Sequence, residues 1–379
     1  MTRALLALVL ILGHFPVAAA KRRAVQHPAA PVAPAAVVTA ATQAAEAALK
    51  AGAPAVQIAV SYRGRVIYSD AFGMTDKESA TAATPRSVMQ IASITKQFTA
   101  AAILRLAERG ALTLDDRIEK FVPEFDPRGA TITLRHLLTH TAGVGAPPPN
   151  QYSPYTREQF ITGVNAQPLA FTPGTQWSYN NANYKLAGHA IESITGMSFA
   201  DFIHREFALP LGLIDTGVCG TSNLPLPGGY GVSQGKLMRT PAVEMSVPFA
   251  AGALCSTASD LVRWSHLLAT GRVMLPASYA TMTTGINPPG NTIAPYGLGV
   301  FVAHQLGHPT VFHTGGITGF QSSLVYFSDQ DMAVAVIVNT WPAPAGVDAT
   351  LIALTVANAA LPATGGAHAL PTAMRSQSR

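Results

Sequence analysis

Three short segments contain side chains whose types and spacing could carry out acyl transfer. Ser93 and Lys96 lie three residues apart at the start of the apolar stretch Ile91–Gly110, a spacing that places both on one face of a helix. Backbone N–H groups at the start of a helix favour negative charge that develops on a serine. A lysine partly stripped of water loses its proton more readily than its reference pKa of about 10.4 implies, and it can help to deprotonate the serine. An N-capping serine beside a snorkelling lysine would give the same spacing, so this segment alone leaves both interpretations open.

Two further segments supply polar groups of a matching kind. Tyr179 and Asn181 lie in "WSYNNANYKLAG", in a loop expected just before a helix, with a Tyr-x-Asn spacing. The end of a predicted strand in "TVFHTGG" carries four more candidates, namely His313, Thr314, Gly315 and Gly316. Adjacent glycines at that point allow a substrate backbone to approach closely. Because the three segments occur in the order and local context that a shared site needs, they favour catalysis over coincidence.

The rest of the sequence predicts the helices and strands that must position these groups. A capping box starts a helix at Thr156–Gln159, and Gly196 ends the helix that runs from Asn183. Strands at both ends of the chain around a helical middle indicate one sheet completed by both ends. The predicted elements are, in order, a helix over 35–50, a hairpin turning at Arg63–Gly64, the Ile91–Gly110 helix, short helices and loops over 112–275, four strands from Tyr296 to Asn339 and a helix over 347–360.

The motifs and the stretches around them resemble the serine β-lactamase and penicillin-recognising superfamily. The resemblance covers roughly Ala45 to Asn339 and includes "IASITKQFTAAAILRLAERGALTLDD", "TLRHLLTHTAGV" and "HTGGITGFQSSLVYF". It is strongest to the branch of class C β-lactamases, DD-peptidases, D-aminopeptidases and related esterases. It implies an α/β (α+β) fold, in which an antiparallel β-sheet is flanked by helices and carries an inserted, mostly helical subdomain.

The same resemblance implies a role for each residue of the three motifs. Ser93 would be the nucleophile, Lys96 its activator and Tyr179 the shared general base and acid. The backbone N–H groups of Ser93 and Gly316 would form the oxyanion hole. The substrate-binding residues would be Asn181, His313, Thr314, Gly315 and Gly316.

The third motif departs from the family pattern at one position. His313 stands where β-lactamases usually carry a lysine. Because a histidine is only partly charged near neutral pH, the sequence predicts a weaker, pH-dependent attraction for a substrate carboxylate. Efficient β-lactam hydrolysis is therefore not expected.

Two other motifs suggest an alternative nucleophile and an alternative metal site. "GVSQG", Gly231–Gly235, matches G-x-S-x-G around Ser233, but no apolar strand precedes it and no helix follows, so we expect a loop. His136 and His140 in "HLLTH" are spaced like zinc ligands on a helix, but Leu137 occupies the position of the catalytic glutamate. In the family this segment is structural, and we expect neither a metal nor a cofactor.

The two ends of the chain indicate export. Residues 1–20 have one basic residue, the apolar run Ala4–Gly13 and small residues before the cleavage site, which is typical of a signal peptide. No cysteine follows that site to accept a lipid, so we expect a periplasmic or secreted protein without a stable membrane anchor. The expected organisation continues with an Ala/Pro-rich linker over 21–34, the hydrolase domain over 35–361 and a flexible tail over 362–379. "LPATG", 361–365, matches a cell-wall sorting signal, but no apolar segment follows it.

Cys219 and Cys255 are the only cysteines. Export makes a disulfide between them chemically feasible, and two buried free thiols are the alternative. By the resemblance, both lie where the chain leads into and out of one loop beside the active site. We therefore predict the disulfide.

The amino-acid composition limits the kinds of molecule that we expect this protein to bind. Only 12% of the 379 residues are charged, the net charge is +5, and no basic stripe with interleaved aromatics occurs, which argues against nucleic acid. The sequence predicts an exported serine hydrolase that acts through an acyl-enzyme on a small-molecule or peptide substrate, cell-wall fragments included. The alternatives are a β-lactamase with weak activity, a penicillin or cell-wall-fragment binder without turnover, and an esterase that uses Ser233.

Overall fold

The computed structural model describes residues 33–145, 148–221 and 224–361. The predicted signal peptide over 1–20, nearly all of the predicted linker and the predicted tail over 362–379 lie outside the described residues. Of the "LPATG" segment, only Leu361 is described.

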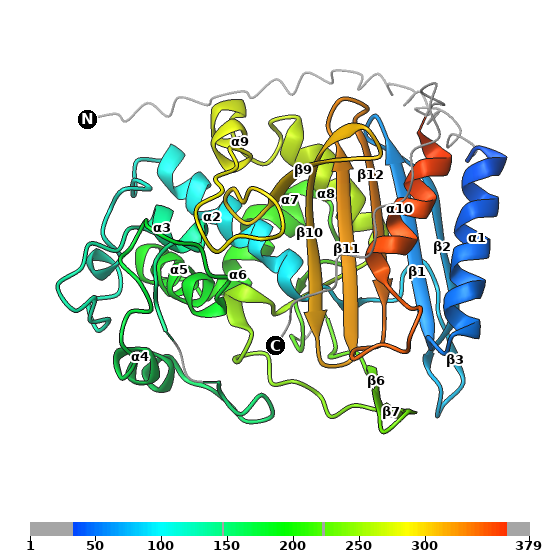
Figure 1. The fold of residues 1–379 in the computed structure, drawn as a ribbon, viewed down its shortest axis with the longest axis horizontal. Helices are drawn as coiled ribbons and strands as arrows, with labels where there is room; N and C mark the ends of the chain where they lie inside the picture. Colours follow the sequence, from blue (N-terminus) through cyan, green and yellow to red (C-terminus); the bar gives the residue numbers. More distant parts are fainter. Residues whose placement is uncertain (1–32, 146–147, 222–223, 362–379) are drawn as a thin grey trace, which may run out of the picture. The chain divides into compact units, whose positions relative to one another are not determined.

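The main sheet has seven strands in the order β3-β2-β1-β12-β11-β10-β9, and each neighbouring pair is antiparallel (Figure 1). Its central pair joins the two ends of the chain, with Val56 opposite Val338 and Tyr62 opposite Met332. This confirms the prediction that both ends complete one sheet. The strands are β1 (Ala55–Tyr62), β2 (Arg65–Asp76), β3 (Thr81–Ala82), β9 (Phe301–Gln305), β10 (His308–Ile317), β11 (Phe320–Phe327) and β12 (Met332–Val338).

Helices cover both faces of this sheet. The terminal helices α1 (Ala35–Lys50) and α10 (Ala349–Ala360) pack on one face, and α8 (Ala258–Ala269) packs on the other (Figure 1). Along β12, even-numbered residues from Met332 to Val338 share a core with α1 and α10, whereas the odd-numbered ones share a core with α8. Because successive side chains of a strand point to opposite faces, a strand covered on both sides must be apolar throughout. Every residue of β12 is accordingly buried.

A mostly helical region lies beside the sheet, between β4 and β9 in the chain. The capping box of Thr156 and Gln159 is present at the start of α4, and Gly196 ends α5 with a φ of 66°, as predicted. The helices here are α2 (Thr95–Glu108), α3 (Leu134–Leu138), α4 (Arg157–Asn165), α5 (Asn181–Thr195), α6 (Phe199–Ile203), α7 (Leu209–Leu211) and α9 (Pro276–Met282). One π turn, His204–Ala208, and three 3₁₀ turns, Ala92–Ile94, Ile118–Lys120 and Phe249–Ala251, connect them.

Two small sheets complete the described fold. The first has the order β4-β8-β5, with β4 (Met89–Gln90), β8 (Leu254–Ser256) and β5 (Gly217–Val218). The second is the hairpin of β6 (Tyr230–Ser233) and β7 (Lys236–Arg239). Over the described ranges, we find no helix with both the length and the apolar character that a membrane crossing requires.

Three predictions about where helices and strands begin differ from the structure. The expected helix from Ile91 begins as the 3₁₀ turn Ala92–Ile94, and α2 starts only at Thr95. The strand expected from Tyr296 starts at Phe301, because Gly297 N–H bonds to the carbonyl of Val300 and closes a turn. Asn181 is the first residue of α5 and not part of the preceding loop, since the side chain of Asn180 caps that helix.

Candidate active site

The Ser93 segment lies against the end of β10. A Cβ on Gly315 would come within 2.3 Å of the carbonyl oxygen of Ile91, so only glycine allows this approach. The hydroxyl of Ser322 on β11 donates to the same carbonyl (2.8 Å). Ala92, next to the serine, has a φ of 47°, a left-handed conformation that costs a non-glycine residue about 1 kcal/mol. The tertiary contacts with the sheet therefore hold Ser93 in a strained turn.

Lys96 connects this turn to two other parts of the site. Its side chain is fully buried, and Nζ bonds to Ser93 Oγ (3.0 Å), Asn181 Oδ1 (2.8 Å) and the carbonyl of Ala251 (2.9 Å). Nζ also lies 4.7 Å from the centre of the Tyr179 ring. The structure thus brings together the first two motifs of the sequence.

The electrostatics of Lys96 are unusual for a lysine. Burial lowers its pKa well below the ordinary value, and the positive charge of Lys185 lowers it further. Its three hydrogen-bond partners are neutral, so none of them supplies the negative charge that would hold its proton. The amine of Lys96 can therefore accept a proton.

The pKa of Tyr179 is shifted in the opposite direction to that of Lys96. Burial raises its pKa, and a hydrogen bond with the Ser93 side chain only partly opposes this. The phenol therefore remains protonated at neutral pH. A protonated phenol beside Ser93 can donate a proton but cannot accept one.

The third motif forms one edge of the site. In the described sheet, β9 pairs with β10 only from His308 to Phe312, so the following residues of β10 have no strand on that side. Gly316 is exposed, Thr314 is half-buried and Gly315 is buried. An extended substrate could pair its backbone with this open edge.

His313 differs from the sequence prediction. Its ring is buried, Nδ1 donates to the carbonyl of Thr314 (2.6 Å), and Nε2 lies 3.1 Å from the hydroxyl of Tyr296, which donates to it. Burial, and then the charge of Lys96, lower its pKa to about 3, against the opposing effect of the backbone hydrogen bond. The prediction that His313 is partly charged near neutral pH was wrong, because the sequence does not reveal this burial.

His140 is a site residue whose role the sequence analysis missed. Its Nδ1 accepts hydrogen bonds from the Asn180 N–H (3.2 Å) and from Asn183 Nδ2 (3.2 Å), and its carbonyl accepts from the Ser178 N–H (3.0 Å). The ring also contacts that of Tyr179, with 4.4 Å between the centres. Burial lowers the pKa of His140 well below its ordinary value, so the ring is neutral. This side chain fixes the loop that carries Tyr179.

The zinc-like spacing in "HLLTH" has a different explanation. Helix α3 ends at Leu138, so His136 and His140 do not share a helical face. His136 Nδ1 accepts a hydrogen bond from the Thr133 N–H (3.4 Å) and completes a capping box. Across residues 33–145, 148–221 and 224–361, no group of three or more His, Cys, Asp or Glu side chains is arranged to hold a metal ion.

We expected a loop at Ser233, and this prediction was wrong. Ser233 is the last residue of β6. The next two residues, Gln234 and Gly235, have φ values of 48° and 74° and form the turn to β7. The segment is thus a strand–turn–strand hairpin with an exposed serine, whereas a nucleophile elbow needs a strand followed by a helix.

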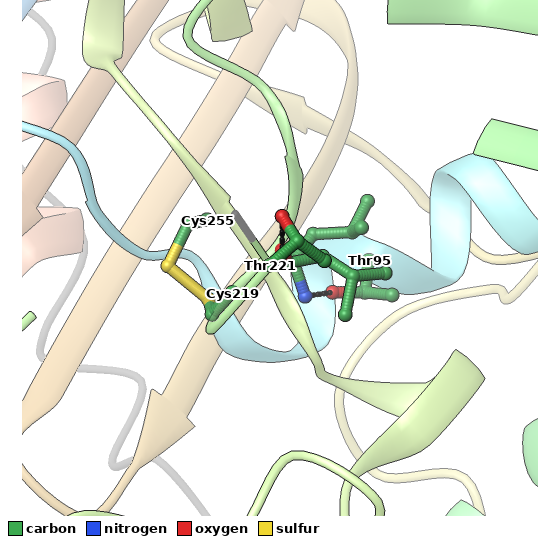
Figure 2. Close-up of a disulfide and its surroundings, with 6 residues drawn as sticks. Thr95, Cys219, Thr221 and Cys255 are labelled. Carbon is green, nitrogen blue, oxygen red and sulfur yellow. Dashed lines mark hydrogen bonds between the residues drawn. A yellow bond between two sulfur atoms is a disulfide. The ribbon is translucent and has the colours of Figure 1, made fainter. Parts of the chain in front are cut away.

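The predicted disulfide between Cys219 and Cys255 is confirmed, and both residues are buried. Cys255 belongs to β8, which pairs with β5 on one side and, on the other, with β4, the strand just before Ser93. The Leu254 N–H of β8 donates to Thr95 Oγ1 (3.1 Å), next to the disulfide (Figure 2). The disulfide therefore supports the strand on which the Ser93 turn rests.

Comparisons with known proteins agree with this fold. The family model described as Beta-lactamase matches residues 36–357. The putative penicillin-binding protein PbpX of Bacillus subtilis (strain 168) is 28% identical over 242 residues, which cover 63% of this chain and 60% of PbpX. Protein flp of Staphylococcus aureus (strain N315) is 27% identical over 311 residues, 76% of this chain and 60% of flp. The chain thus spans about 60% of the length of each of these curated relatives.

Solved structures give the same result. The octameric penicillin-binding protein homologue from Pyrococcus abyssi has a TM-score of 0.74 and 26% identity, covering 85% of this chain and 76% of its own. A D-stereospecific amidohydrolase from Streptomyces sp. has a TM-score of 0.73 and 28% identity, covering 87% and 99% respectively. The fold is therefore that of the β-lactamase and penicillin-binding-protein class. The chain belongs to the Beta-lactamase family.

Proposed function

We propose that this protein hydrolyses an amide or ester through an acyl-enzyme on Ser93, using a single hydrolase domain over 35–361. One observation carries the proposal. Lys96 is buried and bonded to both Ser93 and Asn181, without a carboxylate to keep it charged.

In the proposed first step, the neutral amine of Lys96 accepts the proton of the Ser93 hydroxyl while Oγ attacks the substrate carbonyl. The backbone N–H groups of Ser93 and Gly316 hold the oxygen that becomes negative. Tyr179, which is protonated, donates to the leaving group and is reprotonated from Lys96. Water then attacks the acyl-enzyme and gives a proton to the neutral amine of Lys96, which passes it to Ser93 Oγ as the acyl group leaves. This scheme makes Lys96 the first base and Tyr179 the acid.

The neutral state of His313 bears on the substrate. A lysine at this position would attract a carboxylate next to the scissile bond, whereas a buried imidazole with a pKa of about 3 offers no charge. We therefore favour amides and esters without that carboxylate over β-lactams and over peptides with a free carboxyl terminus. The 28% identity to a D-stereospecific amidohydrolase supports an amide of a D-amino acid as one candidate substrate.

Export is the second part of the proposal. The disulfide between Cys219 and Cys255 is typical of a protein that folds in an oxidising compartment, and it supports the signal peptide proposed for residues 1–20. Mass spectrometry of the protein purified from the periplasm or medium would detect a mature amino terminus near residue 21. A chain that keeps Met1 and remains in the cytoplasm would contradict export.

The catalytic proposal is tested by Ser93→Ala, with Ser233→Ala as a matched control on the exposed hairpin. Hydrolysis of p-nitrophenyl acetate and of D-phenylalanine amide should fall at least about 10³-fold in Ser93→Ala, as loss of a nucleophile normally causes. Ser233→Ala should retain the wild-type rate. Near-wild-type turnover by Ser93→Ala would refute the proposal, and loss in Ser233→Ala alone would favour the other serine.

Two assays separate the alternatives. Nitrocefin hydrolysis that exceeds ester and amide hydrolysis would favour a β-lactamase. A fluorescent penicillin that labels Ser93 and stays attached for hours, with no ester or amide turnover, would favour a binding protein.

A further inference from the structure

The hydrogen bonds of Lys96 determine where the lone pair of its neutral amine points. A charged lysine has three N–H groups, so the neutral amine keeps two N–H groups and one lone pair. Two partners of Nζ, Asn181 Oδ1 (2.8 Å) and the carbonyl of Ala251 (2.9 Å), can only accept hydrogen bonds. The third partner, the hydroxyl of Ser93 (3.0 Å), can also donate. The two acceptors therefore take both N–H groups, and the lone pair faces the hydroxyl that it deprotonates in the proposed scheme.

One of these two acceptors belongs to a segment that has no role in the scheme above. The carbonyl of Ala251 lies at the end of the 3₁₀ turn Phe249–Ala251. If this turn moved away, one N–H group of Lys96 would lose its acceptor. The amine could then rotate and direct its lone pair away from Ser93. The position of the turn therefore affects the base of the proposed reaction.

Helix α2 holds this turn through a second hydrogen bond. Thr99 follows Lys96 by three residues, so the two side chains lie on one face of α2. Thr99 is fully buried, and its Oγ1 donates to the carbonyl of Ala250 (2.6 Å). Lys96 and Thr99 thus bond to successive carbonyls of the turn.

Helix α5 limits how the same turn can be placed. A Cβ on Gly188 would lie 2.4 Å from the Cβ of Ala250 and 2.7 Å from Cε1 of Phe249. The phenyl ring can turn aside, but the Cβ of Ala250 is attached directly to the backbone of the turn. Because two carbon atoms in contact are separated by about 3.5 Å, a side chain on Gly188 would displace the turn by about 1 Å. Only glycine at this position of α5 allows the observed contact.

We propose that Thr99 and Gly188 are positioning residues for the turn Phe249–Ala251. By fixing its last carbonyl, they keep the lone pair of Lys96 directed at Ser93. Since they act on the base and not on the substrate, their loss should lower kcat and leave KM nearly unchanged. This inference rests on the proposed function.

The first test is Gly188→Ala, assayed with p-nitrophenyl acetate and with kcat corrected for the folded fraction by circular dichroism. A misplacement of about 1 Å can reduce a rate roughly 10²-fold, and we expect a fall in kcat of that size. Lys96 is the base for both attack steps of the scheme, so both steps slow together and KM should change by less than about threefold. Ala353→Val on α10, which also adds buried methyl groups but outside the site, should keep the wild-type kcat.

A compensating substitution tests whether the contact itself is the cause. Ala250→Gly removes the methyl group that a side chain at position 188 would meet. The double variant Gly188→Ala/Ala250→Gly should therefore regain at least about tenfold of the lost kcat.

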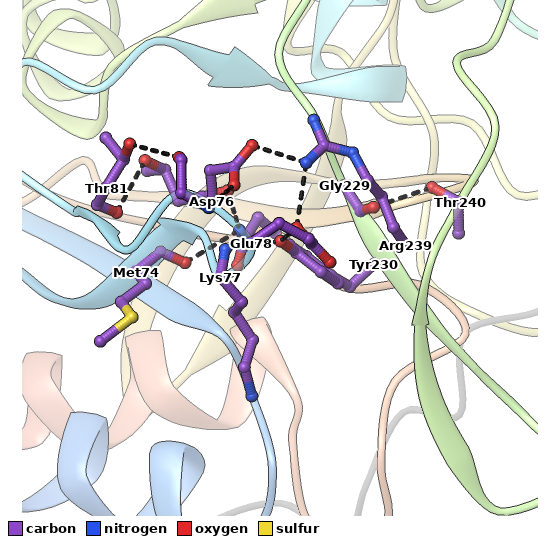
Figure 3. A network of polar contacts seen from close by, with 12 residues as sticks. Met74, Asp76, Lys77, Glu78, Thr81, Gly229, Tyr230, Arg239 and Thr240 are labelled. Atoms are coloured by element: carbon purple, nitrogen blue, oxygen red, sulfur yellow. Dashed lines mark hydrogen bonds and ion pairs between the residues drawn. The ribbon is translucent and has the colours of Figure 1, made fainter.

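Thr99→Val tests the turn from the side of α2, and it keeps the proposal testable if Gly188→Ala does not fold. It removes the hydroxyl while preserving the shape of the side chain, and kcat should fall about tenfold, as loss of one buried hydrogen bond normally causes. Thr99→Ser keeps the hydroxyl and should stay within about threefold of wild type. The matched control is Thr240→Val, because Thr240 Oγ1 also donates to a backbone carbonyl, that of Gly229 (3.1 Å), as Figure 3 shows. This control should keep the wild-type kcat.

Two kinds of result would contradict these expectations. If hydrolysis requires Ser93, a wild-type kcat in folded Gly188→Ala or in Thr99→Val would overturn the positioning role alone. A loss seen only in KM, or a loss in Gly188→Ala that Ala250→Gly does not relieve, would do the same. Hydrolysis that does not require Ser93 would overturn the proposed function and the inference with it.

Discussion

Lys185 provides a sharp test of the electrostatics beneath the site. It lies on α5, is buried, and its Nζ sits over the rings of Tyr155 and Phe160 at 5.1 and 5.4 Å from their centres. Among the described residues it makes no ion pair. Replacing it with methionine keeps the length of the side chain and removes the buried charge.

The size of the expected change in the free energy of unfolding follows from the linkage between protonation and folding. Burial lowers the pKa of Lys185 from 10.5 to about 8 in the folded protein. Because a tenfold change in proton affinity corresponds to about 1.4 kcal/mol, protonated Lys185 costs the fold about 3 kcal/mol below pH 8. The two aromatic rings recover about 1 kcal/mol through cation–π contacts that the substitution removes. Lys185→Met should therefore raise the free energy of unfolding by about 2 kcal/mol at neutral pH.

The lowered pKa of Lys185 also determines how the stability difference between wild type and Lys185→Met changes with pH. Between about pH 8 and 10.5 the unfolded chain holds a proton on Lys185 that the folded protein releases, so the stability of wild type rises with pH across this window. The advantage of Lys185→Met should therefore shrink towards pH 10.5. Urea unfolding followed by circular dichroism near pH 6 and near pH 10 measures both values. Lys236→Met, on the exposed hairpin, is the matched control and should change stability by less than about 0.5 kcal/mol. Destabilisation by Lys185→Met, or an advantage that does not vary with pH, would refute the reasoning.

Two further predictions concern the disulfide and His313. Replacing Cys219 and Cys255 together with serine opens a link across 36 residues and should lower the free energy of unfolding by about 4 kcal/mol in the loop-entropy model, measurable by urea unfolding; an unchanged midpoint would show that the bond adds no stability. Because the pKa of His313 is about 3, the kcat/KM ratio for a carboxylate-bearing and a neutral ester should show no titration of this residue between about pH 5 and 8. A transition in this ratio near pH 6 to 7 that His313→Gln abolishes would show that the ring titrates as an ordinary histidine.

Local patterns in the sequence predicted the elements well, because their causes are local. Alternation of apolar residues, the Thr156 capping box and the glycine after α5 act within one or two turns of chain. They therefore produce the same structure wherever the segment is placed. The exceptions, such as the 3₁₀ turn at Ser93, occur where contacts with β10 impose a strained conformation.

The sequence by itself determined the types of the candidate catalytic groups, their order along the chain and the two cysteines available for a disulfide. Tertiary structure alone decided their protonation states and partners. Whether His313 is charged, which groups surround Lys96, and how His140 holds the Tyr179 loop depend on segments that are far apart in the sequence. Desolvation is the physical reason, because a pKa depends on how much water packing removes, and a residue's neighbours in the chain do not specify that packing.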